Sequence, residues 1–298
     1  MSKLLFQTAQ LQKCWIDCSE IFKSYYQGIV DFNFNSAVQS ADKLNKFIND
    51  YESSNCNNYP DEFYNDCFIF KELANLLSSY SEYWSQVCTG AYDQSWDALQ
   101  DVLDLLRTIK KFTIFDKTFL FKFLEKQALG LERLYPYKLF ASTEIIVSKV
   151  ECGICGNNID SMECDHIQGE LYRGKLAYGI VREIKDCIAV ALVENPANKR
   201  CKMGNIDGKP IIFPCLNYLT ESLLTKKVNP LFISHTEETV RRIQIKDSRI
   251  GRNEICSCGS GKKFKKCCIN KDFAEKKHIE IILKKNNVLT PLDIINFT

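Results

Sequence analysis

The sequence has no run of roughly 20 apolar residues, which is the length that a membrane-spanning helix requires. Its opening stretch, MSKLLFQTAQLQKCW, also lacks the long apolar segment of a secretory signal. Net charge is close to zero, at +2 over 298 residues, so charge alone indicates neither a nucleic-acid binder nor a membrane-surface protein. These absences predict a protein that is neither secreted nor membrane-spanning, and we expect a cytoplasmic location.

Histidine is scarce, with three residues, whereas cysteine is plentiful, with fifteen. Without a secretory signal, clustered thiols indicate a reducing compartment, where they bind metal more often than they form disulfides. Seven of the cysteines lie in two clusters, and the other eight are expected to be small buried hydrophobic residues. These eight are Cys14, Cys18, Cys56, Cys67, Cys88, Cys187, Cys201 and Cys215.

The first half of the chain carries apolar residues at helical spacing. From Trp96 to Ile109 they recur three and four positions apart, which predicts a helix with Ser95 as its N-cap. A second helix is predicted to start near Asp116 and to end before Pro136. Further helices are expected at about 6–27, 36–49 and 66–84.

After Pro136 the pattern changes to short β-branched and apolar runs, which predict strands in a small β-rich or α+β region. One of them, CIAVALV, is uncharged and reads as a buried strand, so its cysteine is expected to be unreactive. The predicted strands are residues 144–150, 176–184, 187–193, 210–213, 231–234 and 239–245.

The first cysteine cluster lies in the stretch ECGICGNNIDSMECDH. Cys152 and Cys155 form a C-x-x-C-G turn, in which the glycine permits the tight backbone that brings both thiolates to one ion. Cys164 and His166 are two positions apart, so in an extended strand they project to the same side. Four potential ligands within fifteen residues predict a tetrahedral zinc site.

Alternatives to this site stay open. Cys187 or Cys201 can replace His166 as the fourth ligand, and the C-x-x-C pair can instead be a redox or buried pair without metal. The Asp165-His166 step also resembles that of HNH nucleases, a resemblance that implies His166 as general base and Asp165 as a ligand of a catalytic metal. That pattern needs an Asn, a further His or Asn on a following helix and a second cysteine pair, and a zinc-bound histidine cannot abstract a proton. We therefore predict no catalytic residue unless this alternative holds.

The second cluster lies in the stretch GRNEICSCGSGKKFKKCC. Cys256 and Cys258 lie in a glycine-rich turn, and Cys267 and Cys268 follow, so that four thiolates can bind one zinc ion. This stretch resembles the SEC-C motif, which occurs in the C-terminal tail of the translocation motor SecA and in many other bacterial proteins. The family pattern is approximately GRNDPCPCGSGKKYKKCC, with CH as an alternative ending.

The resemblance covers about twenty residues and keeps every ligand position. It includes residues 251–253, the turn at 259–261, the lysines and the aromatic Phe264. The sequence departs from the pattern at Glu254-Ile255 and at Ser257, where the family has Asp-Pro and Pro. The resemblance implies zinc binding in a bacterial protein and names no reaction.

Cationic side chains surround the second cluster. A zinc ion held by four thiolates carries a formal charge of minus two, which these cations can offset. They can also form a basic patch for an acidic protein surface or for a nucleic-acid backbone. The resemblance favours a protein partner, because the similar segment of SecA is a docking site for a chaperone. The cations are Arg252, Lys262, Lys263, Lys265 and Lys266.

We therefore predict an α+β protein with a helical domain at 1–145, a β-rich zinc-binding domain at 146–246, a SEC-C knuckle at 249–272 and a basic helical tail at 273–298. Two zinc sites are expected, both structural, because four protein ligands leave no open position for water. The predicted function is that of a zinc-binding adaptor or accessory protein that docks onto a protein partner. The alternatives are an HNH-like metal-dependent nuclease and a nucleic-acid-binding protein.

Overall fold

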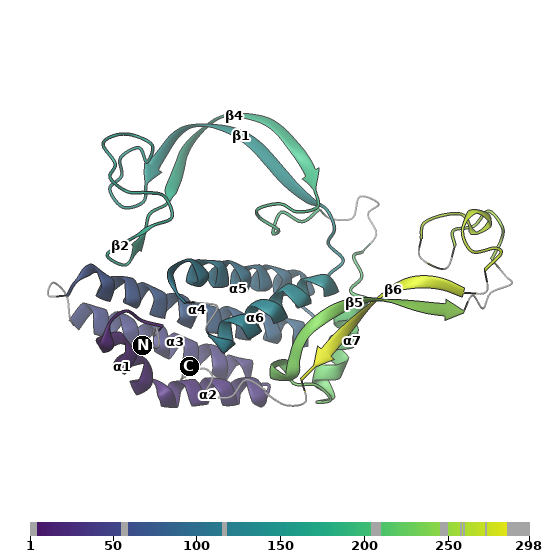
Figure 1. Ribbon diagram of the computed structural model, residues 1–298, viewed down its shortest axis with the longest axis horizontal. Helices are drawn as coiled ribbons and strands as arrows, with labels where there is room; N and C mark the ends of the chain where they lie inside the picture. Colours follow the sequence, from purple (N-terminus) through teal and green to yellow (C-terminus); the bar gives the residue numbers. More distant parts are fainter. Residues whose placement is uncertain are drawn as a thin grey trace.

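The computed structural model confirms the α+β class, with a layer of helices and two long two-stranded ribbons (Figure 1). The helices of the first half are α1 (Ala9–Asp17), α2 (Ser19–Val30), α3 (Phe34–Ser54), α4 (Asp61–Thr89), α5 (Tyr92–Phe112), α6 (Phe119–Leu131) and the 3-10 turn η2 (Glu132–Leu134). The structure describes residues 5–54, 59–114, 118–203, 210–244, 250–256, 258, 260–271 and 273–284.

Helix α4 runs through the middle of the helical layer (Figure 1). Phe63, Phe70, Leu77 and Trp84 lie seven positions apart along it, and all four are buried in one hydrophobic core. The helix ends at Gly90, whose φ of 77° is the left-handed conformation that glycine adopts without strain. Although α4 has 29 residues, neither it nor any other helix in the described part of the chain is long and apolar enough to cross a membrane.

Helix α5 begins at Tyr92, earlier than the sequence predicted. Ser95 is buried inside the helix, where its hydroxyl donates to the Tyr92 carbonyl at 2.9 Å and lies 2.6 Å from the Tyr135 hydroxyl. The prediction of Ser95 as an N-cap is therefore wrong, because its hydroxyl serves a contact with a distant tyrosine. Asp116, the predicted start of the next helix, lies outside the described residues.

The first ribbon pairs β1 (Phe140–Cys152) with β4 (Gly179–Val193) in antiparallel orientation. The paired ends match Phe140 with Val193 and Cys152 with Gly179, although β4 is longer than β1. The register shifts several times, and such β-bulges bend a strand and increase its twist. The ribbon accordingly arches over the helical layer (Figure 1). A short hairpin, β2 (Leu171–Tyr172) and β3 (Lys175–Leu176), lies between the two strands.

Strand β4 is solvent-exposed along most of its length, so the expectation of a buried strand at 187–193 is wrong. Val190 is 64% exposed and Leu192 is 54% exposed. Within the described residues β4 pairs only with β1. The sequence of an apolar strand looks the same whether or not another layer of the protein covers it.

The eight cysteines outside the two clusters differ in burial. Cys14, Cys18 and Cys67 are buried as predicted, Cys88 and Cys215 are half-buried, Cys187 and Cys201 are exposed, and Cys56 lies outside the described residues.

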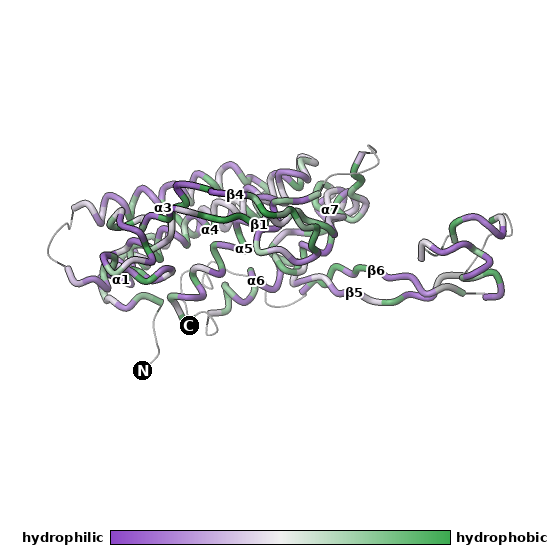
Figure 2. The backbone as a smooth tube through the Cα atoms, turned by 90° about the horizontal axis from the view of Figure 1, so that it is seen from above, coloured by the Kyte–Doolittle hydropathy of each residue, from purple (hydrophilic) through white to green (hydrophobic). Residues whose placement is uncertain are grey.

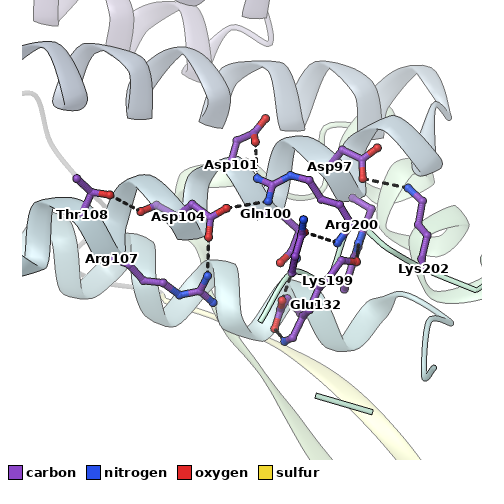
Figure 3. A network of polar contacts seen from close by, with 12 residues as sticks. Asp97, Gln100, Asp101, Asp104, Arg107, Thr108, Glu132, Lys199, Arg200 and Lys202 are labelled. Carbon is purple, nitrogen blue, oxygen red and sulfur yellow. Dashed lines mark hydrogen bonds and ion pairs between the residues drawn. The ribbon is translucent and has the colours of Figure 1, made fainter. Parts of the chain in front are cut away.

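The segment that follows β4 attaches one end of the ribbon to the acidic face of α5 (Figure 3). Arg200 donates to Asp104 at 2.7 Å and also pairs with Asp101. Lys202 lies 3.1 Å from a carboxylate oxygen of Asp97, one turn earlier on the same helix. Because the aspartates stand about one turn apart, a short extended segment can reach several of them at once.

The other end of the ribbon contacts α4 through the β2–β3 turn. Gly174 donates its N–H to the Asn65 side-chain oxygen at 2.9 Å, and Arg173 stacks 4.7 Å from the centre of the Tyr64 ring. Gly174 has a φ of 73°, and a Cβ there would lie 2.6 Å from the Tyr64 carbonyl oxygen. Only glycine fits this approach, so the ribbon is held at both ends.

Helix α7 (Pro214–Leu224) was not predicted, and residues 210–213 do not form the predicted strand. Leu216, Leu219 and Leu223 are buried in the same core as the first six helices. The signals for this helix were a proline at its first position and leucines three and four apart. They were missed because the preceding apolar run suggested a strand.

The second ribbon pairs β5 (Ile233–Gln244) with β6 (Phe273–Leu283), and it projects from the helical body as an arm (Figures 1 and 2). The prediction of a basic helical tail is therefore wrong at 273–283, while 285–298 lies outside the described residues. Ile279, Ile281 and Leu283 alternate along this stretch with the period of a strand. The domain limits at 145 and 246 stay predictions, and β1 begins before the first of them.

The root of the arm is fixed by a buried amide. Gln127 of α6 is fully buried and accepts a hydrogen bond from the Tyr80 hydroxyl at 2.9 Å. Its Nε2 donates to the carbonyl oxygens of Pro230, at 2.9 Å, and Ile233, at 2.5 Å. Pro230 belongs to the 3-10 turn η3 (Pro230–Phe232) that leads into β5. One side chain thus joins α4, α6 and the base of the arm.

We expect Gln127→Ala to lower the free energy of unfolding by roughly 3 kcal/mol, because it leaves buried hydrogen-bonding groups of Tyr80, Pro230 and Ile233 without partners. Denaturant unfolding of the full chain measures this change. Lys126→Ala, at an exposed position of the same helix, is the matched control and should change stability by less than about 0.5 kcal/mol. Equal effects of the two variants would contradict the role assigned to the amide.

Candidate metal centres

Two groups of side chains in the described part of the chain can each hold a metal ion. In each group the four ligand atoms lie within 4.8 Å of one another. Each group also lies at the end of a two-stranded ribbon, one on β1–β4 and the other on β5–β6 (Figure 1). The groups are Cys152, Cys155, Cys164 and His166, and Cys256, Cys258, Cys267 and Cys268.

The first cluster starts where β1 ends. Cys152 is the last residue of that strand and is buried, and its carbonyl accepts a hydrogen bond from the Gly156 N–H at 2.9 Å. Gly156 has a φ of 78°, so the glycine of the C-x-x-C-G sequence takes the left-handed conformation that closes this turn. The turn brings Cys155 to the same side as Cys152, as the sequence predicted.

The remaining two ligands come from the loop that follows. The Cys155 sulfur lies 3.7 Å from the Cys164 sulfur, and the latter lies 3.8 Å from His166 Nδ1. Cys187 lies in the middle of β4, and Cys201 lies in the segment attached to α5. Among the candidates for the fourth ligand, it is therefore His166 that the structure places beside the other three.

Backbone amides favour a thiolate at the first cysteine. The N–H of Cys155 and the N–H of Ile154, the latter at 3.4 Å, point at the Cys152 sulfur and lower the pKa of this thiol. A metal ion binds the deprotonated form of cysteine, so this turn prepares the ligand before the ion arrives.

Two tyrosines support the first cluster and were missed in the sequence. The His166 ring meets the Tyr172 ring edge to face, with centroids 4.7 Å apart, and the Tyr172 hydroxyl accepts the Ile167 N–H at 2.8 Å. A Cβ on Gly153 would lie 2.9 Å from the Tyr178 ring, so this ring packs directly against the turn. No spacing rule links these tyrosines to the cysteines, because the short β2–β3 hairpin brings the first of them into place.

The second cluster is built on a small hairpin. Cys256 donates its N–H to the Lys262 carbonyl, and Phe264 donates to the Glu254 carbonyl, both at 2.8 Å. The 3-10 turn η4 (Phe264–Lys266) follows and delivers Cys267 and Cys268 to the first two cysteines. The early pair and the late pair therefore face each other across the hairpin.

The sulfurs of this cluster are close together and differ in environment. The Cys267 sulfur lies 3.5 Å from that of Cys258 and 3.6 Å from that of Cys268. Hydrogen bonds from the hydroxyl and the backbone N–H of Ser260 lower the pKa of Cys258 to about 6. Burial raises the pKa of Cys268 to about 12. Binding a metal ion therefore has to release a proton from Cys268, so metal affinity is expected to rise with pH.

The departure from the SEC-C pattern at Glu254 keeps the turn before the cluster closed. Glu254 stands where the family has aspartate, and its carboxylate accepts the Gly251 N–H at 3.1 Å. The Glu254 N–H in turn donates to the Gly251 carbonyl at 2.9 Å. Side-chain and backbone bonds thus close the turn without the family's proline. Ser257 and Gly259 lie outside the described residues.

The cations around the second cluster are solvent-exposed. None of them forms an ion pair with another residue in the part of the chain that the structure describes, so their charge faces solvent at the end of the arm. The five side chains are Arg252, Lys262, Lys263, Lys265 and Lys266.

The HNH-like alternative receives no support from this geometry. His166 Nδ1 faces the Cys164 sulfur inside a four-ligand group, an arrangement that suits a metal ligand better than a general base. Neither group in the described residues includes a second histidine. Asp165 is not among the residues whose ligand atoms converge.

Residues 252–270 match the SEC-C motif, which confirms the resemblance seen in the sequence. The match covers the second cluster and does not extend to the helices or to the β1–β4 ribbon. The chain therefore carries a SEC-C motif at the end of its arm, inside a larger protein that the motif does not define.

Similar curated proteins are SecA translocase subunits. The chain is 56% identical to protein translocase subunit SecA of Acetivibrio thermocellus over 43 residues, which are 14% of this chain and 5% of the relative. It is 48% identical to the Lawsonia intracellularis protein over 42 residues, again 14% of this chain and 5% of the relative. It thus spans about a twentieth of the length of the relatives it matches. No solved structure matches the chain.

We expect the purified chain to contain about two zinc ions, because each group offers four protein ligands, the number that a structural zinc ion takes. Cys267→Ser and Cys164→Ser should each remove about one ion, since a ligand is lost from one group only. Elemental analysis measures the metal content. The matched control is Cys187→Ser, which changes an exposed cysteine outside both groups and should leave about two ions. A content near one in the unaltered chain would remove the β1–β4 site.

Proposed function

We propose that this chain is a zinc-stabilised adaptor that docks onto an acidic surface of a protein partner through the SEC-C knuckle at the end of its arm. Zinc is the proposed metal at both sites, because Cys₄ and Cys₃His ligand sets in tetrahedral geometry are typical of structural zinc. Four protein ligands leave no position for a reactive water. The proposed role is therefore binding rather than catalysis.

The observation that carries this proposal is a set of exposed cations at the end of a projecting arm. Lysines held only for their charge balance would be expected to point at the thiolates. Here Lys262, Lys263, Lys265 and Lys266 are exposed and form no ion pair with any described residue. An acidic protein surface offers them the carboxylates that this chain does not supply. This agrees with the docking role that the SEC-C resemblance implies.

A protein fits the arm better than a nucleic acid does. Glu237 of β5 lies directly opposite Glu280 of β6, and Glu238 and Glu275 lie on the same two strands. Glu280 pairs with Arg241 and Glu238 pairs with Lys277, so the strands of the arm carry balanced charge rather than a basic surface for a phosphate backbone. A protein surface can present mixed charges to such an arm. The nucleic-acid alternative therefore has no specific observation in its favour.

A cytoplasmic location belongs to the same proposal. The cysteines in the described part of the chain are all free, including several that are solvent-exposed. Free thiols and thiolate metal sites persist in reducing compartments, where disulfides rarely form. The adaptor is expected to act there.

Pull-down of partners by the full chain tests the docking surface. We expect the pair of changes Lys262→Glu and Lys263→Glu to abolish capture of the partner while the zinc content stays at about two, since the knuckle keeps its ligands. The same pair of reversals at Lys226 and Lys227, exposed residues just after α7, should leave capture unchanged. Capture that survives the knuckle reversals, or that disappears after nuclease treatment, would contradict docking to an acidic protein.

Incubation with DNA or RNA and an added divalent metal tests the catalytic alternative. We expect no cleavage, because the four ligand atoms at each group are protein atoms. Cleavage by the unaltered chain that stops in a folded His166→Ala variant would overturn the adaptor proposal. Denatured protein is the blank for contaminating nuclease.

A further inference from the structure

The β1–β4 ribbon exposes more apolar surface than a free ribbon in water is expected to keep. Large apolar side chains along β4 are exposed, and apolar stretches run along both strands (Figure 2). Contiguous exposed apolar patches of this kind mark interaction surfaces. The exposed apolar residues of the ribbon are Ile145, Ile146, Val181, Ile184, Ile188, Val190 and Leu192.

One edge of β4 is also free. Strand β4 pairs with β1 on one side, and no other described strand pairs with it. This edge is not regular, because the pairing with β1 skips Arg182, Lys185 and Ile188, and the Cys187 N–H donates to the Asp186 carboxylate at 2.8 Å. The backbone N–H and C=O groups that stay unpaired along an edge strand can add another strand. The ribbon arches away from the helical layer, which leaves the middle of β4 accessible (Figure 1). This region combines apolar side chains with unpaired backbone groups.

The middle of β4 has a charge pattern that is complementary to itself. Residues 182–186 read Arg-Glu-Ile-Lys-Asp, with Ile184 at the centre. In an antiparallel pair of two such strands centred on Ile184, Glu183 lies opposite Lys185 of the other strand, and Arg182 lies opposite Asp186. Opposite charges across an antiparallel pair stabilise it, whereas like charges destabilise it. The flanking residues are apolar on both sides, so apolar residues also meet apolar residues.

We propose that two copies of this chain associate through the middle of β4, antiparallel and around a two-fold axis at Ile184. The interface is isologous, since the same segment serves both copies. Arg182 already pairs with Glu151 of β1 at 2.6 Å. Glu183 and Lys185 form no ion pair with any residue that the structure describes, so they are the charges available to the second copy.

A second copy fits this surface better than an unrelated strand does. An unrelated strand would have to supply the reverse order of charges by coincidence, while a second copy supplies it by symmetry. The apex of the arch lies near the middle of β4, so two arches meet at the segment with the complementary charges. This association does not rest on the proposed docking role of the SEC-C knuckle.

Charge reversal tests the pairing directly. We expect the full chain to sediment as a dimer, and Glu183→Lys or Lys185→Glu alone to raise the dissociation constant about tenfold or more, because each places like charges opposite each other twice. An equimolar mixture of the two variants should recover the dimer. In the mixed pair, every altered side chain faces an opposite charge on the other copy.

Sedimentation equilibrium of the full chain measures these states, with zinc content and circular dichroism as the check on folding. The matched controls are Glu221→Lys and Lys227→Glu, exposed positions on and after α7, which should leave the dimer unchanged. Three outcomes would overturn the proposal. They are a monomeric unaltered chain at about 100 μM, a dimer that tolerates both reversals, and a mixture of the two variants that stays monomeric.

Discussion

A two-stranded ribbon cannot bury a core of its own, and this constraint governs both parts of the molecule that carry the metal ligands. Isolated hairpins are marginal in water, so their ends must be held by something else. Here the helical core holds one end of each ribbon, and a group of convergent cysteine or histidine side chains lies at the other. A metal ion bound at Cys256 or Cys152 would therefore do more than organise a loop, because it would supply the closure that the strands lack.

The helical layer works as a base that sets the positions of both ribbons. The acidic face of α5 holds the segment after β4, and Gln127 of α6 holds the turn before β5. The β1–β4 ribbon is also attached at its metal end, through Gly174 on α4, whereas β5–β6 is attached at one end only. The two clusters consequently differ in setting, since one lies against the body and the other projects into solvent (Figure 1).

Much of this was accessible from the sequence, and the failures have physical reasons. Helical spacing identified the N-terminal layer, and the spacing of cysteines identified both ligand groups, because these signals are local. Burial of CIAVALV was wrong because an apolar strand looks the same whether a layer covers it or not. The strand β6 was missed because its lysines favour a helix, and only pairing with β5 decides between the two. Tyr172 could not be found, since tertiary folding alone brings it to His166.

The direction of the arm depends on a glycine, Gly130 of α6. Strand β5 crosses α6 at Gly130, where a Cβ would lie 2.6 Å from the Thr236 backbone nitrogen. The Thr236 hydroxyl donates to the Gly130 carbonyl at 2.7 Å, so helix and strand touch through their backbones. Over the length of β5, a small tilt at this crossing becomes a large displacement of the knuckle. The position of the SEC-C knuckle is thus set near the core, at a crossing where one added methyl group would change the angle of the whole arm.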